Sequence, residues 1–452
     1  MRNMTGHRAI PFSALRFGRR VALLGASLFA AMLAGGVAEA GPHETVGQHY
    51  ELRASDLPAP YSAAPPRVVA ENVDRPEGVL PKVPQGFHVS VFAGDLSGPR
   101  EMAVAPNGDV LVAQTFHGDI VVLRDADGDG IAETKAVFAE GFREPSGLAI
   151  RDGALYVADR RAIWRLPFDD GALKARPREM VTRPGALGEG GGHITREIVF
   201  APDGKHFYVS IGSKRNVAEE ASPRATIQKF RADGYLQTTF ASGLRNPVGM
   251  AFYPGTDDLY AVVNEREGLG EGLVPDYLTR VVRGGFYGFP YAYLGAHPDP
   301  QFGDLRPDLV QATLTPDVLF APQSGPFGLL FYKGEDFPQE YKGDAFVALH
   351  GAWSGGRPSG YEVVRVRFRD GRPQGGYETF MTGFGQPGQR ADKAAEAATE
   401  VWGRPAWLAE ARDGSMLVSD DMANVIWRVT WSGAMPAPNA LHTLPPITVS
   451  AP

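Results

Sequence analysis

Apolar residues recur along the chain in pairs of short runs, and a turn joins the two runs of each pair. The pattern repeats six times: a polar or Pro-containing approach leads into one apolar run, and a turn leads into the second. The copies begin at Pro99, Glu144, Thr195, Asn246, Gly325 and Arg404, and they end at Ala113, Ala158, Ser210, Ala261, Ala348 and Ser419. Asn-Gly or Asp-Gly between alternating apolar residues is the strongest short-range hairpin signal. The pattern therefore predicts six β-hairpins.

A row of hairpins cannot bury its apolar faces or protect its edge strands unless the copies stack or close into a ring. We therefore predict an all-β fold, a six-bladed β-propeller, in which the residues between the copies supply the outer strands. The segment from Phe87 to Phe92 precedes the first copy and is expected to complete the last blade, which closes the ring. The alternative is an open sandwich of unrelated hairpins, and six regular copies make it the weaker one.

The chain divides into four predicted parts: a signal peptide at 1–40, an N-terminal extension at 41–79, the propeller at 80–433 and a flexible C-terminal tail at 434–452. Arg19 and Arg20 precede the apolar run from Val21 to Met32, and small residues follow at a plausible cleavage point before Gly41. We expect a periplasmic or secreted protein, exported by the general or the twin-arginine route, with an uncleaved anchor as the alternative. No other apolar stretch is long enough to span a bilayer, so we expect no transmembrane domain in the mature chain.

Composition narrows the chemistry. The 452 residues include no cysteine, which excludes disulfides, zinc–thiolate sites, iron–sulfur clusters and covalently attached c-type haem. A formal net charge of -7 argues against a nucleic-acid partner, because nucleic-acid-binding domains are normally basic. The sequence also has no Gly-x-Gly-x-x-Gly between a strand and a helix and no Gly-x-Ser-x-Gly, which weakens the nicotinamide-enzyme and serine-hydrolase interpretations.

Polar residues at the start of the copies are the candidates for chemistry, because loops at one mouth of the channel usually bind a propeller's ligands. His193 follows three glycines, which let the backbone turn tightly or approach a ligand closely. Arg245 and Asn246 stand at the start of the fourth copy, and Arg404 opens the sixth. Two arginines and a histidine at one mouth would make an anion site with a general base. The alternative, which weighs most for Arg404, is that these groups cap strand ends and pair with acids.

A separate acidic segment has the spacing of a calcium loop. Asp125, Asp127 and Asp129 occupy the first, third and fifth positions of an EF-hand pattern, and Gly130 occupies the sixth. Ala136 stands where the bidentate Glu of that pattern is expected. Calcium in a structural role and a metal-free acidic turn are equally open.

Six segments, in order, resemble the pyrroloquinoline quinone (PQQ)-dependent glucose and sorbosone dehydrogenases, and most closely the sorbosone dehydrogenase branch. They are Leu80–Phe92, Gly191–Gly204, Gly243–Gly249, Tyr287–Pro290, Gly403–Pro405 and Ser419–Asp421. The second holds Gly-Gly-His-x-x-Arg followed by Phe-Ala-Pro-Asp-Gly, and the third reads Gly-Leu-Arg-Asn-Pro-Val-Gly. Each motif alone is weak, whereas the ordered set spans the chain from Leu80 to Trp431 and is fairly specific.

The resemblance implies a propeller that binds PQQ and oxidises a sugar or a related alcohol or aldehyde. Arg245 and Arg404 would bind the carboxylates of the cofactor, and Asn246 would bind the quinone oxygens. His193 would take the proton of the substrate hydroxyl or aldehyde hydrate while a hydride moves to the quinone. Calcium would polarise the quinone carbonyl. Because no haem motif is present, electrons would pass to a separate acceptor, a quinone or a cytochrome.

Further positions follow from the same resemblance. Gln114 matches a position near the cofactor, and His350 is the candidate for a cationic residue expected late in the chain. The calcium segment departs from the family, because Asn264-Glu-Arg-Glu-Gly268 stands where a Glu-His-Gly-Pro run is typical. The backbone carbonyls of Glu267 and Gly268 stay the candidate calcium ligands, since hard cations accept any oxygen.

Two other functions stay open on the sequence. A calcium-dependent lactonase on a similar scaffold would need acidic and amide ligands converging on the channel, and it would leave the paired arginines without a use. A non-catalytic propeller that binds protein or cell-wall partners would leave the glycine-flanked His193 unexplained. The long insertion at 264–324 is expected to shape the pocket for a small sugar or aldehyde substrate.

Overall fold

A computed structural model describes residues 45–64, 70–188, 190–352, 359–387 and 399–433. The predicted signal peptide and the predicted C-terminal tail lie outside the described residues, so both stay predictions. All described residues belong to one compact unit, Ala40–Pro452. Within this described part of the chain, no helix has the length and apolar character that a membrane span requires.

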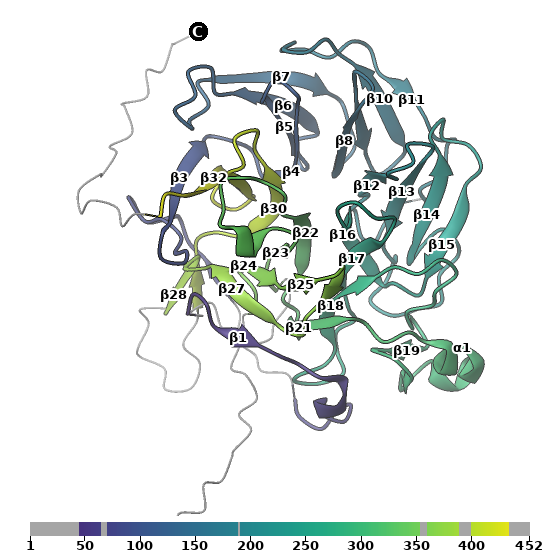
Figure 1. Cartoon of the computed structure of the whole chain (residues 1–452). Coiled ribbons are helices and arrows are strands. Elements are labelled where there is room, and N and C mark those ends of the chain that lie inside the picture. The colour runs from purple at the N-terminus through teal and green to yellow at the C-terminus, as the bar shows by residue number, and fades with distance from the viewer. Residues whose placement is uncertain (1–44, 65–69, 189, 353–358, 388–398, 434–452) are drawn as a thin grey trace, which may run out of the picture. The chain divides into compact units, whose positions relative to one another are not determined.

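The strands form six antiparallel blades around a central axis, which confirms the predicted six-bladed β-propeller (Figure 1). Blade 1 is β4 (Pro99–Val104), β5 (Val110–Gln114), β6 (Asp119–Arg124) and β7 (Thr134–Glu140). Blade 2 is β8 (Gly147–Arg151), β9 (Ala154–Ala158), β10 (Ile163–Pro167) and β11 (Glu179–Met180). Blade 3 is β12 (Ile198–Phe200), β13 (His206–Ile211), β14 (Thr226–Arg231) and β15 (Thr238–Ser242).

The other three blades follow the same order from the axis outward. Blade 4 is β16 (Asn246–Phe252), β17 (Leu259–Asn264), β18 (Pro275–Arg280) and β21 (Val318–Pro322). Blade 5 is β22 (Pro326–Phe331), β23 (Ala345–Leu349), β24 (Glu362–Val366) and β27 (Tyr377–Met381). Blade 6 is β30 (Pro405–Glu410), β31 (Met416–Asp420), β32 (Val425–Trp431) and β3 (Phe87–Ala93).

Blade 6 joins the two ends of the propeller sequence. Its three inner strands come from the last copy of the repeat, whereas its outer strand β3 precedes blade 1. Phe87 pairs with Trp431, and Val91 pairs with Trp427, in an antiparallel register. The prediction that Phe87 to Phe92 completes the last blade and closes the ring is therefore confirmed.

The predicted turns form where glycine permits them. Gly108 has a φ of 99°, which other residues rarely adopt, and its N–H donates to the carbonyl of Ala105 at 2.9 Å. The N–H of Gly204 donates to the carbonyl of Ala201 at the same distance, 2.9 Å. Each of these hairpins is thus specified locally by its own turn residues.

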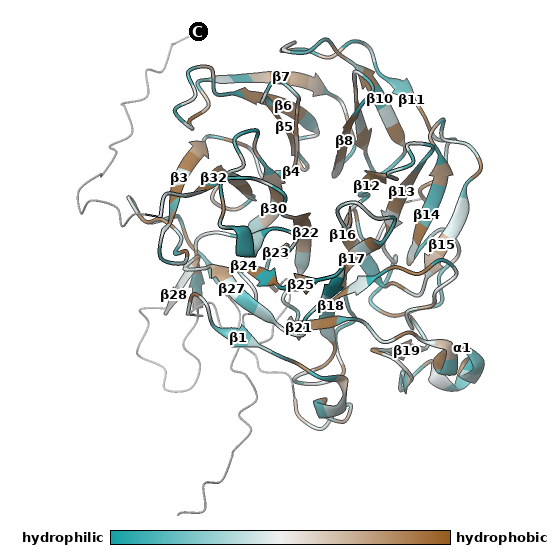
Figure 2. Ribbon diagram, viewed as in Figure 1, coloured by the Kyte–Doolittle hydropathy of each residue, from teal (hydrophilic) through white to brown (hydrophobic). Residues whose placement is uncertain are grey.

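The second strand of each blade lies at the centre of the core. Every residue of β5, β9, β23 and β31 is buried, because adjacent blades cover both faces of each sheet. Burial on both faces explains why these strands read as continuous apolar runs rather than as alternating ones. Strands near the axis, such as β8 and β22, are accordingly hydrophobic, and many outer loops are hydrophilic (Figure 2).

The N-terminal extension adds strands to two sheets. β1 (His49–Tyr50) pairs with β27 as a fifth strand of blade 5. β2 (Glu71–Asn72) runs parallel to β29 (Thr399–Val401), which pairs with β28 (Gly385–Pro387). One 3-10 helix, η1 (Ala54–Asp56), lies between β1 and β2 in the sequence.

The predicted insertion at 264–324 is in part regular blade, so its predicted extent is wrong. β18 and β21 are the third and fourth strands of blade 4. Between them, residues 281–317 form β19 (Ala292–Tyr293), β20 (His297–Pro298), η2 (Gly303–Leu305) and α1 (Pro307–Ala312), and β19 and α1 lie at the outer edge of the propeller (Figure 1). Blade 5 also carries η3 (Gln339–Tyr341) and a small hairpin of β25 (Phe368–Arg369) and β26 (Arg372–Pro373).

Candidate active site

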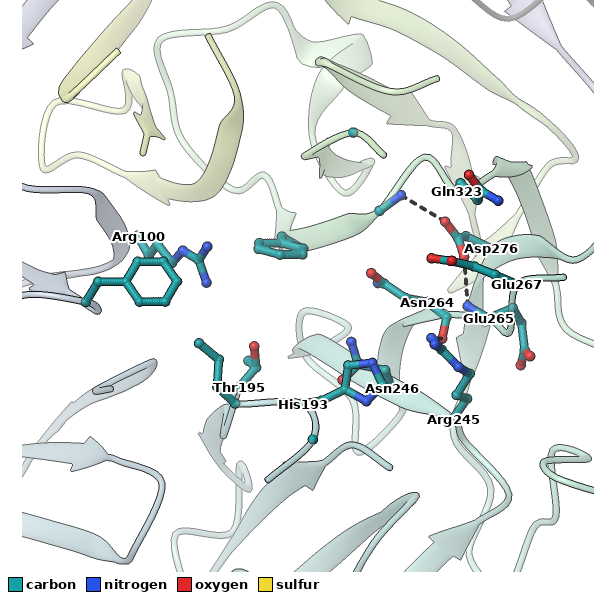
Figure 3. A pocket seen from close by; sticks show the side chains of 16 residues that line it. Arg100, His193, Thr195, Arg245, Asn246, Asn264, Glu265, Glu267, Asp276 and Gln323 are labelled. Atoms are coloured by element: carbon teal, nitrogen blue, oxygen red, sulfur yellow. Dashed lines mark hydrogen bonds between the residues drawn. The ribbon is translucent and has the colours of Figure 1, made fainter. Parts of the chain in front are cut away.

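A cavity of about 300 Å³ lies at the end of the propeller channel where the inner strands begin. Blades 1, 3, 4 and 5 and the loops beside them supply its lining: Arg100, Phe116, Gly192, His193, Ile194, Thr195, Arg245, Asn246, Asn264, Glu265, Glu267, Asp276, Gln323, Gly325, Phe327 and Gly351. Figure 3 shows Arg100 on one side, three acidic residues on the opposite side, and His193 with Asn246 between them. A cavity of this volume suits a small molecule.

His193 is held in the tautomer that a general base needs. Its Nδ1 lies 2.9 Å from the carbonyl oxygen of Ser213, which can only accept, so Nδ1 carries the proton and Nε2 keeps its lone pair. The backbone N–H of His193 donates to the same carbonyl at 3.1 Å. Burial, together with the charge of Arg245, lowers the pKa of His193 to about 3, so the ring is neutral at neutral pH. The imidazole is therefore a fixed hydrogen-bond acceptor in the cavity.

Arg245 and Asn246 lie beside His193 in the cavity lining. Nε and Nη2 of Arg245 donate to the backbone and side-chain oxygens of Asn216, each at 3.0 Å, and Nη1 donates to the carbonyl of Asn264 at 3.2 Å. Burial lowers the pKa of Arg245, although a guanidinium stays charged at neutral pH. Oδ1 of Asn246 is buried and has no hydrogen-bond partner among the described residues. A fixed cation beside an unused amide oxygen is a place for a polar ligand.

The opposite wall carries two buried acids from blade 4. Asp276 accepts the backbone N–H groups of Glu265 at 2.7 Å and of Gly325 at 2.8 Å. Oε2 of Glu265 accepts the N–H of Arg266 at 3.0 Å, while its Oε1 has no partner in the described structure. Burial raises the pKa of Glu265 and of Asp276 to about 7. Oε1 of Gln323 also lacks a partner there, so this wall presents unused oxygens.

The carbonyl of Glu267, predicted to bind calcium, is already occupied. It accepts the side-chain amide of Asn216 at 3.0 Å and two N–H groups of the Arg266 guanidinium at 3.3 Å each. Arg266 is held there by a buried ion pair with Asp299. Gly268 is exposed and does not line the cavity. The predicted pair of carbonyls therefore does not fit a calcium ion, because a cationic side chain occupies the place of the metal at the first of them.

A stack of rings and one guanidinium forms the wall that faces these acids. The guanidinium carbon of Arg100 lies 4.8 Å from the ring centroid of Phe116 and 5.3 Å from that of Phe327. Phe327 stacks on His350 with the centroids 4.2 Å apart. Asp421 joins the two ends of the stack: it accepts Nε of Arg100 at 2.8 Å and Nε2 of His350 at 2.8 Å. The Asp421 carboxylate therefore fixes the guanidinium of Arg100 and the imidazole of His350 from behind the cavity.

Three residues predicted to bind the cofactor do not line the cavity. Gln114 uses both ends of its amide within blade 1 and its neighbouring loop. His350 is fully buried behind Phe327. Arg404 donates to three backbone carbonyls between His350 and Ala352, at 2.8 to 3.2 Å. The structure thus brings His193, Arg245 and Asn246 together in the cavity lining, and Gln114, His350 and Arg404 are not part of that lining.

Sequence reasoning missed Arg100, Phe116 and the acidic wall. Arg100 follows Pro99 at the start of copy one, and a charged residue at the start of a copy is the signal that could have identified it. Phe116 lies in the turn between β5 and β6, where no motif marks it. Asp276 belongs to a blade strand that the predicted insertion concealed.

Outside the cavity, the predicted acidic loop gathers four carboxylates. Ligand oxygens of Asp125, Asp127, Asp129 and Glu133 all lie within 4.8 Å of one another. These oxygens also accept backbone N–H groups of the loop itself, for example that of Gly128 by Asp125 at 2.7 Å. Both predicted alternatives fit this geometry, so calcium at the loop stays a prediction.

A family model described as TrAA12-like matches residues 81–274 and 309–432, which is most of the chain. The chain belongs to the TrAA12-like family. Every residue of the cavity lining except Asp276 lies within the matched segments. The gap at 275–308 covers the blade strand β18, the peripheral strands β19 and β20, η2 and the first two residues of α1.

Two curated relatives show how far the similarity extends along the chain. A protein of uncharacterised function from Borreliella burgdorferi is 26% identical over 364 residues, which cover 77% of this chain and 90% of the relative. A PQQ-dependent pyranose dehydrogenase from Coprinopsis cinerea is 25% identical over 333 residues. That match covers 63% of this chain and 44% of the fungal enzyme, so the chain spans less than half of the fungal enzyme's length.

Solved structures of related proteins share the fold. The holo form of the pyranose dehydrogenase PQQ domain from Coprinopsis cinerea has a TM-score of 0.64 at 18% identity, and the match covers 82% of this chain and 99% of that one. An AA12 carbohydrate-active enzyme from Trichoderma reesei also has a TM-score of 0.64 at 18% identity, with coverages of 78% and 98%. PQQ-bound aldose sugar dehydrogenase from Streptomyces coelicolor has 0.53 at 18%, with 77% and 99%. With the family match, these relatives confirm the resemblance, while the sorbosone dehydrogenase branch stays a prediction.

Proposed function

We propose that this TrAA12-like protein is a PQQ-dependent dehydrogenase that oxidises a sugar or a related alcohol or aldehyde. The observation that carries the proposal is the neutral, anchored imidazole of His193 beside Arg245 and Asn246 in one small cavity. The class of reaction is supported by the fungal relative, which is a PQQ-dependent pyranose dehydrogenase. A lactonase or an interaction propeller has no comparable use for an anchored base next to a buried guanidinium.

The cavity residues suit a quinone that carries carboxylates. Arg245 would hold one carboxylate, because a guanidinium binds that group through paired hydrogen bonds. Asn246 would hold the quinone oxygens, since its buried amide has unused hydrogen-bonding capacity. Bound PQQ supplies the carbon that accepts a hydride from the substrate. Calcium at Glu267 is left out of the proposal because donors already occupy that carbonyl.

Within this site, His193 is the base that removes the substrate's hydroxyl proton. Its free Nε2 accepts the proton while the Ser213 carbonyl keeps the ring in place through Nδ1. A pKa of about 3 describes a weak base, and the charge of Arg245 is one cause of the low value. An anion bound at Arg245 would offset that charge and raise the pKa of His193 toward its ordinary range. The base would therefore become competent when the cavity holds its anionic partner.

The proposal includes the route of the electrons and the place of the protein. The sequence has no cysteine to attach a haem, so the electrons would leave to a separate quinone or cytochrome. The predicted signal peptide supports a periplasmic or secreted protein. Substrates of the sorbosone type belong to the proposal as one candidate among small sugars and aldehydes.

The test is a PQQ titration of the purified mature protein, followed by dye reduction with a panel of sugars and aldehydes. We expect stoichiometric PQQ binding and substrate-dependent dye bleaching. His193→Ala should lower kcat by about 100-fold or more and leave PQQ affinity within about twofold, because a positioned base contributes 10²- to 10⁴-fold. His206→Ala is the matched control: this histidine belongs to the same blade but pairs with Asp203 at 2.9 Å, outside the cavity lining.

Two results would contradict the proposal. The first is that the wild-type protein binds no PQQ, with or without calcium, at concentrations that saturate the aldose sugar dehydrogenase from Streptomyces coelicolor. That result would favour the lactonase or the interaction propeller over the dehydrogenase. If His193→Ala keeps full turnover, His193 is not the base, even where PQQ binds. The titration is run both with calcium and with a chelator. Because donors already occupy the carbonyl of Glu267, we expect the same PQQ affinity in both conditions.

A further inference from the structure

Arg100 is a cation in the cavity lining that the proposed reaction does not use. It belongs to β4, lies across the cavity from the acidic wall (Figure 3), and is only 4% exposed. The rings of Phe116 and Phe327 both contact its guanidinium, with centroids 4.8 and 5.3 Å from the guanidinium carbon. Nε donates to Asp421 at 2.8 Å. The guanidinium is therefore fixed before any ligand binds.

One end of this fixed group is unused. In the part of the chain that the structure describes, Nη2 of Arg100 is buried and has no hydrogen-bond partner. A buried donor without an acceptor is energetically unfavourable, so native proteins normally satisfy it with a water or a ligand. Because Arg100 lines the cavity, an oxygen atom inside the cavity is the available acceptor.

Phe116 adds an apolar surface at the same place. It lies in the turn between β5 and β6, lines the cavity, and leaves 64% of its surface exposed. An exposed aromatic ring at a cavity rim is a binding surface for an apolar face. Sugar rings have such a face, made of C–H groups, and their oxygens accept hydrogen bonds at the edge. The aromatic ring of Phe116 therefore matches the C–H face of a sugar, and the neighbouring N–H of Arg100 matches an oxygen at the edge of the sugar.

We propose that Arg100 and Phe116 form the sugar-binding subsite of the cavity and that this subsite takes an uncharged cyclic sugar. The C–H face of the sugar packs on Phe116, and one sugar oxygen accepts the N–H of Arg100 Nη2. This inference rests on the proposed function, and it names the class of substrate and the residues that recognise it.

The distribution of charge favours an uncharged sugar over a sugar acid. Asp421 already pairs with Arg100, so the two together present no net charge to the substrate. The facing wall carries Glu265, Glu267 and Asp276. A uronate would meet a neutralised cation on one side and, on the other, a wall in which Glu265 and Asp276 are partly ionised at neutral pH, and a further negative charge beside them is unfavourable.

The experiment compares variants of the mature protein loaded with PQQ. Phe116→Ala removes the ring, and Arg100→Lys keeps a positive charge beside Asp421 but removes the Nη2 donor. Tyr235→Ala is the control, because Tyr235 is 50% exposed and stacks on Arg183 at 5.3 Å without lining the cavity. Phe116→Leu is added, since it keeps apolar bulk in the turn, and thermal melts confirm that each variant folds.

The readouts are kcat and KM for the best uncharged sugar of the panel and for its uronate, together with PQQ affinity measured by absorbance. Phe116→Ala and Arg100→Lys should each raise KM for the uncharged sugar roughly tenfold, with kcat changed by less than about twofold, as expected when a contact is equal in ground and transition states. PQQ affinity should not change. Tyr235→Ala should match the wild type, which should prefer the uncharged sugar at least tenfold in kcat/KM.

Each other outcome overturns the inference. Unchanged KM in Phe116→Ala and Arg100→Lys rejects the subsite, and reduced PQQ affinity would assign the two residues to the cofactor instead. A preference for the uronate rejects the uncharged class. If the wild-type protein binds no PQQ, the proposed function fails and the subsite fails with it; the separate PQQ titration distinguishes this case from a failure of the subsite alone.

Discussion

The inner strands of the propeller differ at one equivalent position of the repeat. Blades 2, 4 and 5 carry glycine there, at Gly147, Gly249 and Gly328, whereas blades 1 and 3 carry glutamate, at Glu101 and Glu197. A Cβ atom on Gly147 or Gly249 would lie 2.2 Å from a backbone oxygen of the next inner strand, and one on Gly328 would lie 2.8 Å from a backbone carbon. Glycine is required because neighbouring inner strands approach so closely.

The two glutamates meet each other instead. Glu101 is 2% and Glu197 is 4% exposed, and their carboxyl groups share a hydrogen bond. Two carboxylates in contact cannot both ionise in a buried site, so the pair holds a proton. Oε2 of each residue has no partner among the described residues. Burial raises the pKa of both groups.

One repeat position therefore serves backbone packing in three blades and polar chemistry in two. Glu101 follows Arg100 directly, and Glu197 stands two residues after Thr195; Arg100 and Thr195 both line the cavity. The glutamates therefore stand near cavity-lining residues in the sequence, the glycines serve close packing between blades, and blade 6 carries Trp407 at the same position. Substitution of one of the glycines should destabilise the fold through a steric clash. Substitution of one of the glutamates should instead change how stability depends on pH.

The largest expected effect is that of Gly249→Ala. Its Cβ would overlap the carbonyl oxygen of Phe327, and a backbone atom cannot move aside without separating blades 4 and 5. We expect the free energy of unfolding to fall by about 3 kcal/mol or more, or no soluble protein at all. Chemical denaturation measures the change. Gly94→Ala is the control, because no atom lies within 4 Å of its added Cβ, and an unaltered stability of Gly249→Ala would disprove the close approach.

Glu101→Gln should have an intermediate effect that depends on pH. The pKa of Glu101 is raised from 4.5 to about 8 by burial, so the native state binds an extra proton between these values. The resulting stability is complete below about pH 4.5 and is lost as pH rises toward 8, at up to about 1.4 kcal/mol per pH unit. Glu101→Gln should flatten this slope and be more stable than the wild type at pH 8. Thermal melts from pH 5 to pH 8 measure both slopes, and parallel slopes would reject the shared proton.

The smallest expected effect concerns the acidic loop, whose carboxylates are partly or fully exposed and bonded to their own backbone, unlike the buried pair. If calcium binds there, adding it at ten times its Kd should stabilise the protein by about 1.4 kcal/mol. Asp127→Asn should abolish that shift and leave PQQ affinity intact. Calorimetric melts in calcium and in chelator decide the question, and an equal shift in the variant would place the calcium elsewhere.

The fold was predictable because its signals are local. Turn glycines such as Gly108 and Gly204 specify hairpins, and strands buried on both faces give continuous apolar runs. The extent of the insertion was not predictable, because β18 is separated from β17 by the loop that carries Glu265 and Glu267, and its polar residues hide a blade strand. Closure of the propeller ring depends on one apolar segment before the first copy, Phe87 to Phe92, and the sequence was sufficient to predict its role.

The candidate site was predictable only where its residues open a copy of the repeat or stand just before one. Asn246 opens copy four, His193 and Arg245 stand just before copies three and four, and all three line the cavity. Whether a polar residue faces the cavity or lies behind it depends on packing between blades, as for His350 behind Phe327. Such packing brings together residues that are far apart in the sequence, and the spacing of residues along the chain does not predict it.

The closing strand also sets the order in which the molecule can be completed. Phe87 emerges early during synthesis, yet its partner Trp431 is among the last residues of the propeller to be made. Until then the nascent chain is an open arc with unpaired edges, and joining its ends carries the entropic cost of closing a long loop. Arg100 of blade 1 meets Asp421 of blade 6 only across this junction. The contact between Arg100 and Asp421, which holds one wall of the cavity, therefore forms only when the last blade is in place.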